Sequence, residues 1–325
     1  MRYGKVPQAL PAGERQGKAA AFNQKNIRPA LPEPGEFDDF WRGGLAEVAA
    51  VPPDIRQKRI EALCDGRREV YRLSFATVGG GRIYGFLTRP AGPGPFPALV
   101  SVPGAGPGTG PDTDPANEGF AVLCCNVFPY ETTEECAENE RRYEAFNRQG
   151  LYIYRGAESP EHCLLRSALL GISRAADWLA EQPFADADRI GVFGSSQGGG
   201  FALMLAGLKP RFRAAAANVP AFCDFGGEKS GWPQFRQHGF DRMKLFDAAY
   251  FAARIRCPVK MIAGWCDEVC PPESVYAAYN CISAPKEIVD EPAMAHEIWP
   301  SYGRLLQWLK GELPFLLFST TSSMS

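Results

Sequence analysis

The chemistry in this sequence centres on a serine placed between glycines. Residues 194–198 read Gly-Ser-Ser-Gln-Gly, which fits the pattern G-x-S-x-G with Ser196 in the middle. Ser195 does not fit, because Phe193 stands where its first glycine would have to be. An apolar run precedes the motif and a helical pattern follows it, the context of a nucleophile on a sharp strand-to-helix turn. The alternative is a glycine-rich turn or phosphate cradle, but the dinucleotide fingerprint and the P-loop lysine are both absent. We therefore expect Ser196 to be a nucleophile.

A serine nucleophile needs a base, and the sequence offers three histidines. In α/β-hydrolases the order along the chain is serine, acid, histidine. His162 precedes the serine, and His238 comes too early to follow an acid that lies after a later strand. His296 follows the last predicted strand and lies in a loop, so we expect it to be the base. The alternative is an ordinary histidine on a surface loop.

The acid of such a triad is expected at the end of the penultimate strand. Residues 259–267 read Val-Lys-Met-Ile-Ala-Gly-Trp-Cys-Asp, which places Asp267 there. Its role would be to orient His296 and to stabilise the imidazolium. Glu268 is the adjacent rival, and Asp290 belongs to the last strand itself, where a structural role is the simpler interpretation.

An oxyanion hole requires two backbone N–H donors. One is expected from Gln197, the residue after the nucleophile, and the other from the loop after an earlier strand. Residues 102–108 read Val-Pro-Gly-Ala-Gly-Pro-Gly, so Gly104 or Ala105 would present the second donor. The alternative is an ordinary turn rich in glycine and proline.

Short apolar runs alternate with helical patterns along most of the chain. The expected strands are 69–76, 82–88, 97–102, 120–127, 189–193, 212–219, 259–264 and 286–290. The expected helices are 37–50, 163–181, 199–208 and 303–313. This alternation predicts an α/β-hydrolase fold, with a mostly parallel central sheet and helices on both faces. The expected parts are an extended N-terminal arm (1–35), the hydrolase domain (36–313), an insertion or lid after the sixth strand (223–250) and a C-terminal tail (314–325).

Composition narrows the class of protein. The chain has 325 residues, 45% of them hydrophobic, and a formal net charge of −2, which gives no electrostatic reason to expect nucleic acid or an anionic membrane. No apolar run approaches the length of a membrane span, and the N-terminus has no secretory h-region. The ten cysteines are scattered, without zinc spacing, which favours free thiols and a cytoplasmic protein. If a signal had been removed, a secreted protein with disulfides would be the alternative.

Several segments together resemble the acetyl xylan esterase and cephalosporin C deacetylase family, carbohydrate esterase family seven. The similarity spans roughly 36–313. The segments that carry it are Gly194-Ser-Ser-Gln-Gly-Gly199, His296-Glu297, Asp267-Glu-Val-Cys-Pro-Pro272, Asn218-Val-Pro-Ala-Phe-Cys-Asp-Phe225 and Glu36-Phe-Asp-Asp-Phe-Trp41. Two motifs depart from the family: its Arg-Gly-Gln is replaced by residues 127–131, Val-Phe-Pro-Tyr-Glu, and its His-Gly-Tyr by Pro103-Gly104-Ala105.

The resemblance implies a serine esterase that removes acetyl groups from sugars such as acetylated xylo-oligosaccharides. It implies no metal and no organic cofactor, and association of identical chains into a homo-oligomer. Four aromatic residues are candidates for the substrate pocket, although each is equally expected as a core or oligomer contact: Tyr130, Phe222, Phe225 and Trp232.

Two other functions are compatible with the same motifs. One is an esterase or peptidase that acts on a non-carbohydrate substrate through the same triad. The other is a binding protein that keeps the fold without activity, against which the complete set of serine, aspartate and histidine argues. A nucleotide-binding oxidoreductase is excluded by the missing glycine fingerprint.

Overall fold

A single mixed sheet positions everything else in the computed structural model, which describes residues 24–114, 117, 119–148, 150, 152–228, 243–297 and 301–313. Its nine strands lie in the order β1-β2-β3-β5-β4-β6-β7-β8-β9. The strands are β1 (Arg56–Arg59), β2 (Arg68–Ala76), β3 (Arg82–Pro90), β4 (Phe96–Val102), β5 (Ala121–Cys125), β6 (Ala185–Ser195), β7 (Ala214–Asn218), β8 (Val259–Gly264) and β9 (Lys286–Glu291). The six strands β4 to β9 run parallel to one another, whereas β1, β2 and β3 form an antiparallel edge.

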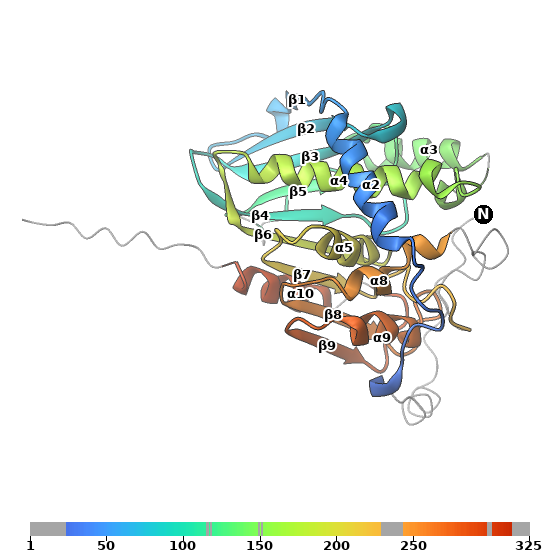
Figure 1. The fold of residues 1–325 in the computed structure, drawn as a ribbon. Coiled ribbons are helices and arrows are strands. Elements are labelled where there is room, and N and C mark those ends of the chain that lie inside the picture. Colours follow the sequence, from blue (N-terminus) through green and yellow to red (C-terminus); the bar gives the residue numbers. More distant parts are fainter. Residues whose placement is uncertain are drawn as a thin grey trace, which may run out of the picture.

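Helices cover both faces of this sheet, but unequally. The α-helices are α2 (Phe37–Ala50), α3 (Cys136–Asn147), α4 (Leu164–Ala180), α5 (Gln197–Leu208), α8 (Ala248–Ala252), α9 (Pro272–Cys281) and α10 (Ser301–Gly311). Figure 1 shows α2, α4, α5 and α8 lying across one face of the sheet. The other face packs against α10, through Leu305 and Leu309. This arrangement confirms the predicted α/β-hydrolase fold.

The buried strands explain why the central runs read as continuously apolar. In β4, Ala98 and Val100 belong to the larger core beneath α4 and α5, whereas Leu99 belongs to the smaller core beneath α10. Successive side chains of a strand point to opposite faces, so a strand covered on both sides buries every residue. The helical stripe 163–181 likewise packs one face of α4 into the larger core.

One strand and three α-helices of the structure were not predicted from the sequence. β1 reads Arg-Gln-Lys-Arg and is exposed along its whole length, as an edge strand can be. Because β1 adds a strand, the insertion follows the seventh strand, β7, and not the sixth as expected. Three helices, α3, α8 and α9, were also not predicted. α3 is mostly polar, and α8 has only five residues and overlaps the end of the predicted insertion.

The described ends of the insertion belong to the core. Residues 223–228 and 243–250 are described, and residues 229–242 between them are not. Trp232 and His238 therefore lie outside the described residues. Asp247 accepts hydrogen bonds from the backbone N–H groups of Asp224, Phe225 and Ala249. This carboxylate therefore fixes where the insertion leaves and re-enters the domain.

The described part of the N-terminal arm is anchored along the domain. The amide of Asn280 donates to the carbonyl oxygens of Gln24 and Ile27, at 2.8 and 3.0 Å. The backbone N–H of Ala30 donates to Asp224 at 2.7 Å. Residues 24–35 thus lie against α9 and the base of the insertion. None of the described helices is both long and apolar enough to cross a membrane.

Candidate active site

Ser196 stands on the turn between β6 and α5. Its backbone has φ of 55° and ψ of −118°, a left-handed conformation that is uncommon and strained for any residue but glycine. α5 begins at the next residue, Gln197. The turn lies where β6 ends, so Ser196 stands at the carboxyl ends of the parallel strands.

The two glycines of G-x-S-x-G are required by close backbone approach. A Cβ at Gly194 would lie 2.3 Å from the carbonyl carbon of Gly198 and 2.7 Å from the oxygen of Val102. A Cβ at Gly198 would lie 2.0 Å from that same Val102 oxygen. No side chain fits at either position, so the turn is held tightly against the end of β4.

Three polar side chains from different parts of the chain meet at this turn. His296 Nε2 lies 3.0 Å from Ser196 Oγ, and His296 Nδ1 lies 2.8 Å from Asp267 Oδ2. An ionised carboxylate can only accept, so the proton is on Nδ1 and Nε2 is free to accept from the serine. The structure therefore brings together the three residues that the sequence singled out, in the order of a catalytic triad.

The Asp267 carboxylate is buried and fixed. Its side chain has no exposed surface, and its Oδ1 accepts from the backbone N–H groups of Val269 and Cys270, each at 2.8 Å. Its Oδ2 is thereby left for the histidine. The loop that carries His296 rests on the end of β8, where a Cβ at Gly264 would lie only 2.7 Å from the oxygen of Met294.

The rival acids and the first histidine have different surroundings from those of Asp267 and His296. Glu268 is exposed. Asp290 accepts hydrogen bonds from Trp265 Nε1 at 2.7 Å and from the Tyr276 hydroxyl at 2.7 Å, which is a structural role. His162 is exposed at the end of a short 3₁₀ turn.

Ser195 turns away from the triad. It is buried, and its Oγ accepts from the side-chain amide of Asn218 at 3.2 Å. The choice of Ser196 over Ser195 therefore agrees with the geometry of the turn.

The predicted oxyanion residues lie against the elbow. A Cβ at Gly104 would lie 3.9 Å from Ser196 Cβ. The Gln197 side chain is fully buried, and its amide donates to the oxygens of Pro103 and Gly104, each at 3.4 Å. Ala105, the next residue, is half-buried. The Gln197 side chain thus joins the start of α5 to the loop after β4.

Tyr152 is a residue of this region that the sequence did not reveal. Its hydroxyl donates to Gln197 Oε1, and its ring packs edge-on against Phe128 with centroids 4.8 Å apart. Tyr130 stacks on the same Phe128 at 5.2 Å and is half-buried. These aromatic rings therefore lie on the Gln197 side of the elbow.

The predicted pocket residues Phe222 and Phe225 lie in the core. They are 3% and 1% exposed, and their rings contact each other at 6.0 Å. Phe222 also packs against Phe201 of α5. Phe222 and Phe225 are therefore core residues, which was one of the alternatives that the sequence left open.

Cys270 is the one thiol beside the triad among the described cysteines. It is 1% exposed and contacts the Ser196 side chain. Burial raises the pKa of this thiol well above its usual value, so the thiol does not compete with Ser196 as a nucleophile near neutral pH. Its sulfur, an Asp267 oxygen and a His296 nitrogen lie within 4.8 Å of one another, the one such set of possible metal donors among the described residues.

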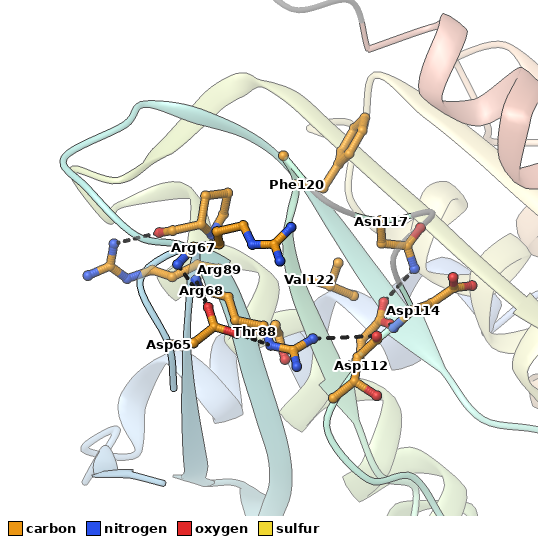
Figure 2. Close-up of a pocket in the computed structure, with 13 residues that line it drawn as sticks. Asp65, Arg67, Arg68, Thr88, Arg89, Asp112, Asp114, Asn117, Phe120 and Val122 are labelled. Atoms are coloured by element: carbon orange, nitrogen blue, oxygen red, sulfur yellow. Dashed lines mark hydrogen bonds and ion pairs between the residues drawn. The ribbon is translucent and has the colours of Figure 1, made fainter. Parts of the chain in front are cut away.

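A cavity of about 390 Å³ lies away from this site, at the amino end of β5. Figure 2 shows its charged lining, with the Arg68 guanidinium reaching toward the oxygen of Thr113. Arg68 also pairs with Asp65 at 3.7 Å, and the Asn117 amide donates to Asp112. Several of its charged groups pair with neighbouring side chains, and the described residues that line it include no serine, cysteine or histidine.

Comparison with known proteins identifies the family to which the chain is similar. The family model of acetyl xylan esterase (AXE1) matches residues 22–228 and 233–312. The acetyl esterase Axe7A of Xylanibacter ruminicola is 31% identical over 314 residues, which cover 90% of this chain and 70% of that protein.

Solved structures show the same relationship. Acetyl xylan esterase 1 from Thermoanaerobacterium sp. JW/SL YS485 superposes with a TM-score of 0.79 at 27% identity, over 94% of this chain and all of the other. Acetyl xylan esterase from Paenibacillus sp. R4 shares the fold, with a TM-score of 0.72 at 23% identity, over 93% of this chain and 99% of that one. The fold, the match over most of the chain and the identity to Axe7A lead to one conclusion: the chain belongs to the acetyl xylan esterase family of carboxylic ester hydrolases.

Proposed function

We propose that this protein removes acetyl groups from carbohydrate esters through an acetyl-enzyme on Ser196. The observation that carries the proposal is the line from Ser196 Oγ to His296 Nε2, at 3.0 Å, and from His296 Nδ1 to Asp267, at 2.8 Å. Membership of the acetyl xylan esterase family supports acetylated carbohydrates as the substrate class.

The first half-reaction forms the acetyl-enzyme. Ser196 Oγ attacks the acetyl carbonyl carbon while His296 Nε2 accepts the hydroxyl proton. The carbonyl oxygen takes up negative charge, and the sugar oxygen leaves with the proton that His296 returns to it. Buried Asp267 holds the imidazole in the required tautomer and stabilises its charged form.

The second half-reaction releases acetate. Water takes the place of the sugar, gives its proton to His296 and attacks the acetyl carbon. The tetrahedral intermediate then collapses, and Ser196 recovers its proton from the histidine. In both halves the developing oxyanion would be stabilised by the backbone N–H of Gln197 and by that of Ala105 or Gly104. The positive end of the 12-residue helix α5 points at the same place.

The test of substrate class compares leaving groups and acyl lengths. Acetate release from acetylated xylo-oligosaccharides is measured beside hydrolysis of butyryl and octanoyl esters and of a peptide p-nitroanilide. We expect the acetylated sugars to give the highest kcat/KM. Faster cleavage of the anilide or of the long-chain esters would replace the carbohydrate proposal with the peptidase or general-esterase alternative. Ser196→Ala controls for release that does not depend on the triad.

Two wider expectations also remain proposals. Association of identical chains is tested by the mass of the native protein in light scattering. Cytoplasmic location is tested by fractionating the cells that produce the full-length protein.

A further inference from the structure

Cys270 occupies a position that the hydrolytic mechanism does not use. Its backbone N–H donates to Asp267 Oδ1 at 2.8 Å, so the residue is fixed relative to the acid. Its thiol contacts Ser196, and its sulfur lies within 4.8 Å of both an Asp267 oxygen and a His296 nitrogen. Neither step of ester hydrolysis requires a sulfur at this place.

The donor atoms around this point are of the types that zinc selects. Zn²⁺ binds cysteine sulfur at about 2.3 Å and histidine nitrogen or carboxylate oxygen at about 2.0–2.2 Å, in a tetrahedron. Donor atoms of such a site lie roughly 3.2–3.7 Å apart, as follows from those bond lengths. Here the Asp267–His296 contact is 2.8 Å and every separation is within 4.8 Å, so shifts on the order of 1 Å would close the site.

The three donors also leave room for a fourth ligand. Three protein ligands with an open position are the usual set for an exchangeable zinc ion, whereas four close a structural site. Because Asp267 faces His296 Nδ1, the zinc ion would bind that nitrogen, and a water molecule would take the fourth position. His296 has 25% of its side chain exposed, whereas the Asp267 side chain has none, so a metal would arrive from the histidine side.

We propose that Asp267, Cys270 and His296 form an inhibitory Zn²⁺ site within the triad. The inference rests on the proposed function, because only a working triad can be inhibited in this way. On binding, the Cys270 thiol releases its proton to solvent and its sulfur forms the zinc bond, while the imidazole changes tautomer, so that Nδ1 binds zinc and Nε2 carries the proton. No group is oxidised or reduced. Bound zinc would block catalysis. A coordinated His296 cannot accept the Ser196 proton, and a coordinated Asp267 cannot orient His296.

The kinetic test uses chelator-treated enzyme and p-nitrophenyl acetate. Hydrolysis is titrated with ZnCl₂ for the wild type, for Cys270→Ala and for the matched variant Cys266→Ala. Cys266 is also buried and lies four residues earlier, but its thiol donates to the oxygen of Pro292 at 3.3 Å. We expect the wild type and Cys266→Ala to be inhibited alike and restored by chelator. Half-inhibition of Cys270→Ala should need about 10-fold more zinc or higher, as expected when a metal site loses a binding group.

A spectroscopic test does not depend on activity. Co²⁺ added to the Ser196→Ala protein should give a near-ultraviolet thiolate-to-cobalt absorption band that Zn²⁺ displaces. The band should persist when Cys266→Ala is added and vanish when Cys270→Ala is added. Equal zinc inhibition of the wild type and Cys270→Ala, or cobalt bound without a thiolate band, would overturn the proposal. If the wild type hydrolyses no ester but the band forms, the proposed function fails and the metal site stands.

Discussion

The Tyr152 hydroxyl donates a hydrogen bond to the side-chain oxygen of Gln197, 45 residues further along the chain. The amide nitrogen of the same Gln197 side chain donates to the oxygens of Pro103 and Gly104. One buried side chain therefore links the start of α5 to the loop after β4, the two segments proposed to form the oxyanion hole. Tyr152 fixes the orientation of that amide, because the oxygen must face the hydroxyl and the nitrogen must face the loop.

Tyr152→Phe should therefore slow the chemical step. The change leaves the buried Gln197 oxygen without its donor, at a cost of about 1–3 kcal/mol, and lets the amide turn. We expect kcat for p-nitrophenyl acetate to fall about 10-fold or more, with KM changing less than about twofold, because donors aligned on the oxyanion act mainly in the transition state. Tyr302→Phe, on the α10 side of the sheet, is the matched control. Equal kcat values for both variants would mean that the Tyr152 bond does not position the oxyanion hole.

The glycines of the elbow can be tested against a glycine that has free space. Gly198→Ala would place a Cβ 2.0 Å from the Val102 oxygen, so the turn must open and the free energy of unfolding should fall by about 3 kcal/mol or more, with loss of activity. Gly43, exposed in α2, has nothing within 4 Å of its Cβ position. Gly43→Ala should raise the free energy of unfolding by about 0.5–1 kcal/mol. Urea unfolding measures the free energy of unfolding of both variants. A similar loss of stability in Gly198→Ala and Gly43→Ala would contradict the close approach at Gly198.

Substitution of two adjacent carboxylates tests which residue is the acid of the triad. Asp267→Ala should lower kcat about 10³- to 10⁴-fold, because His296 loses its orienting partner. Glu268→Ala, at an exposed position, should leave kcat within about twofold. Steady-state kinetics on p-nitrophenyl acetate decides, and a loss in Glu268→Ala as large as in Asp267→Ala would reassign the acid.

Asp290→Ala should behave as a structural change. It removes the acceptor of Trp265 Nε1 and of the Tyr276 hydroxyl, so the free energy of unfolding should fall by about 2–4 kcal/mol. The folded fraction should keep a kcat within about threefold of the wild type. Urea unfolding and active-site titration separate the two effects. A specific loss of kcat with unchanged stability would contradict this role.

The cysteines should react as free thiols of very different accessibility. Cys136, at the start of α3, is exposed, whereas the other nine are buried or half-buried. With 5,5′-dithiobis(2-nitrobenzoate) at pH 7 we expect one fast equivalent, from Cys136. Raising the pH to about 9 should release few others, because burial raises the pKa of Cys163 and of Cys257 to about 11 each, so both stay protonated. Fewer than ten reactive thiols after unfolding without reductant would indicate disulfides.

Order and position along the chain were enough to single out Ser196, Asp267 and His296. Each follows a parallel strand at its carboxyl end, and such ends meet along one edge of the sheet, so residues 100 positions apart could be expected to meet. Helical periodicity predicted α2, and a short apolar run predicted β8, with the bounds that the structure gives them.

The rest depended on tertiary contacts that leave no local pattern. Tyr152 lies in a short 3₁₀ turn without periodicity, and only the fold places its hydroxyl beside Gln197. Phe222 and Phe225 have the residue type of a pocket wall and of a core alike, so only packing distinguishes the two. Arg56–Arg59 forms a strand by pairing with β2, although its charged side chains carry no strand signal.

Hydrolysis of p-nitrophenyl acetate by the wild type, Ser196→Ala and Ser195→Ala tests whether Ser196 is the nucleophile. The two serines are adjacent, but Ser195 is held by Asn218 and Ser196 by His296. We predict a kcat that falls more than about 10³-fold in Ser196→Ala and stays within about 10-fold in Ser195→Ala. Equal rates for the wild type and Ser196→Ala would show that Ser196 is not the nucleophile.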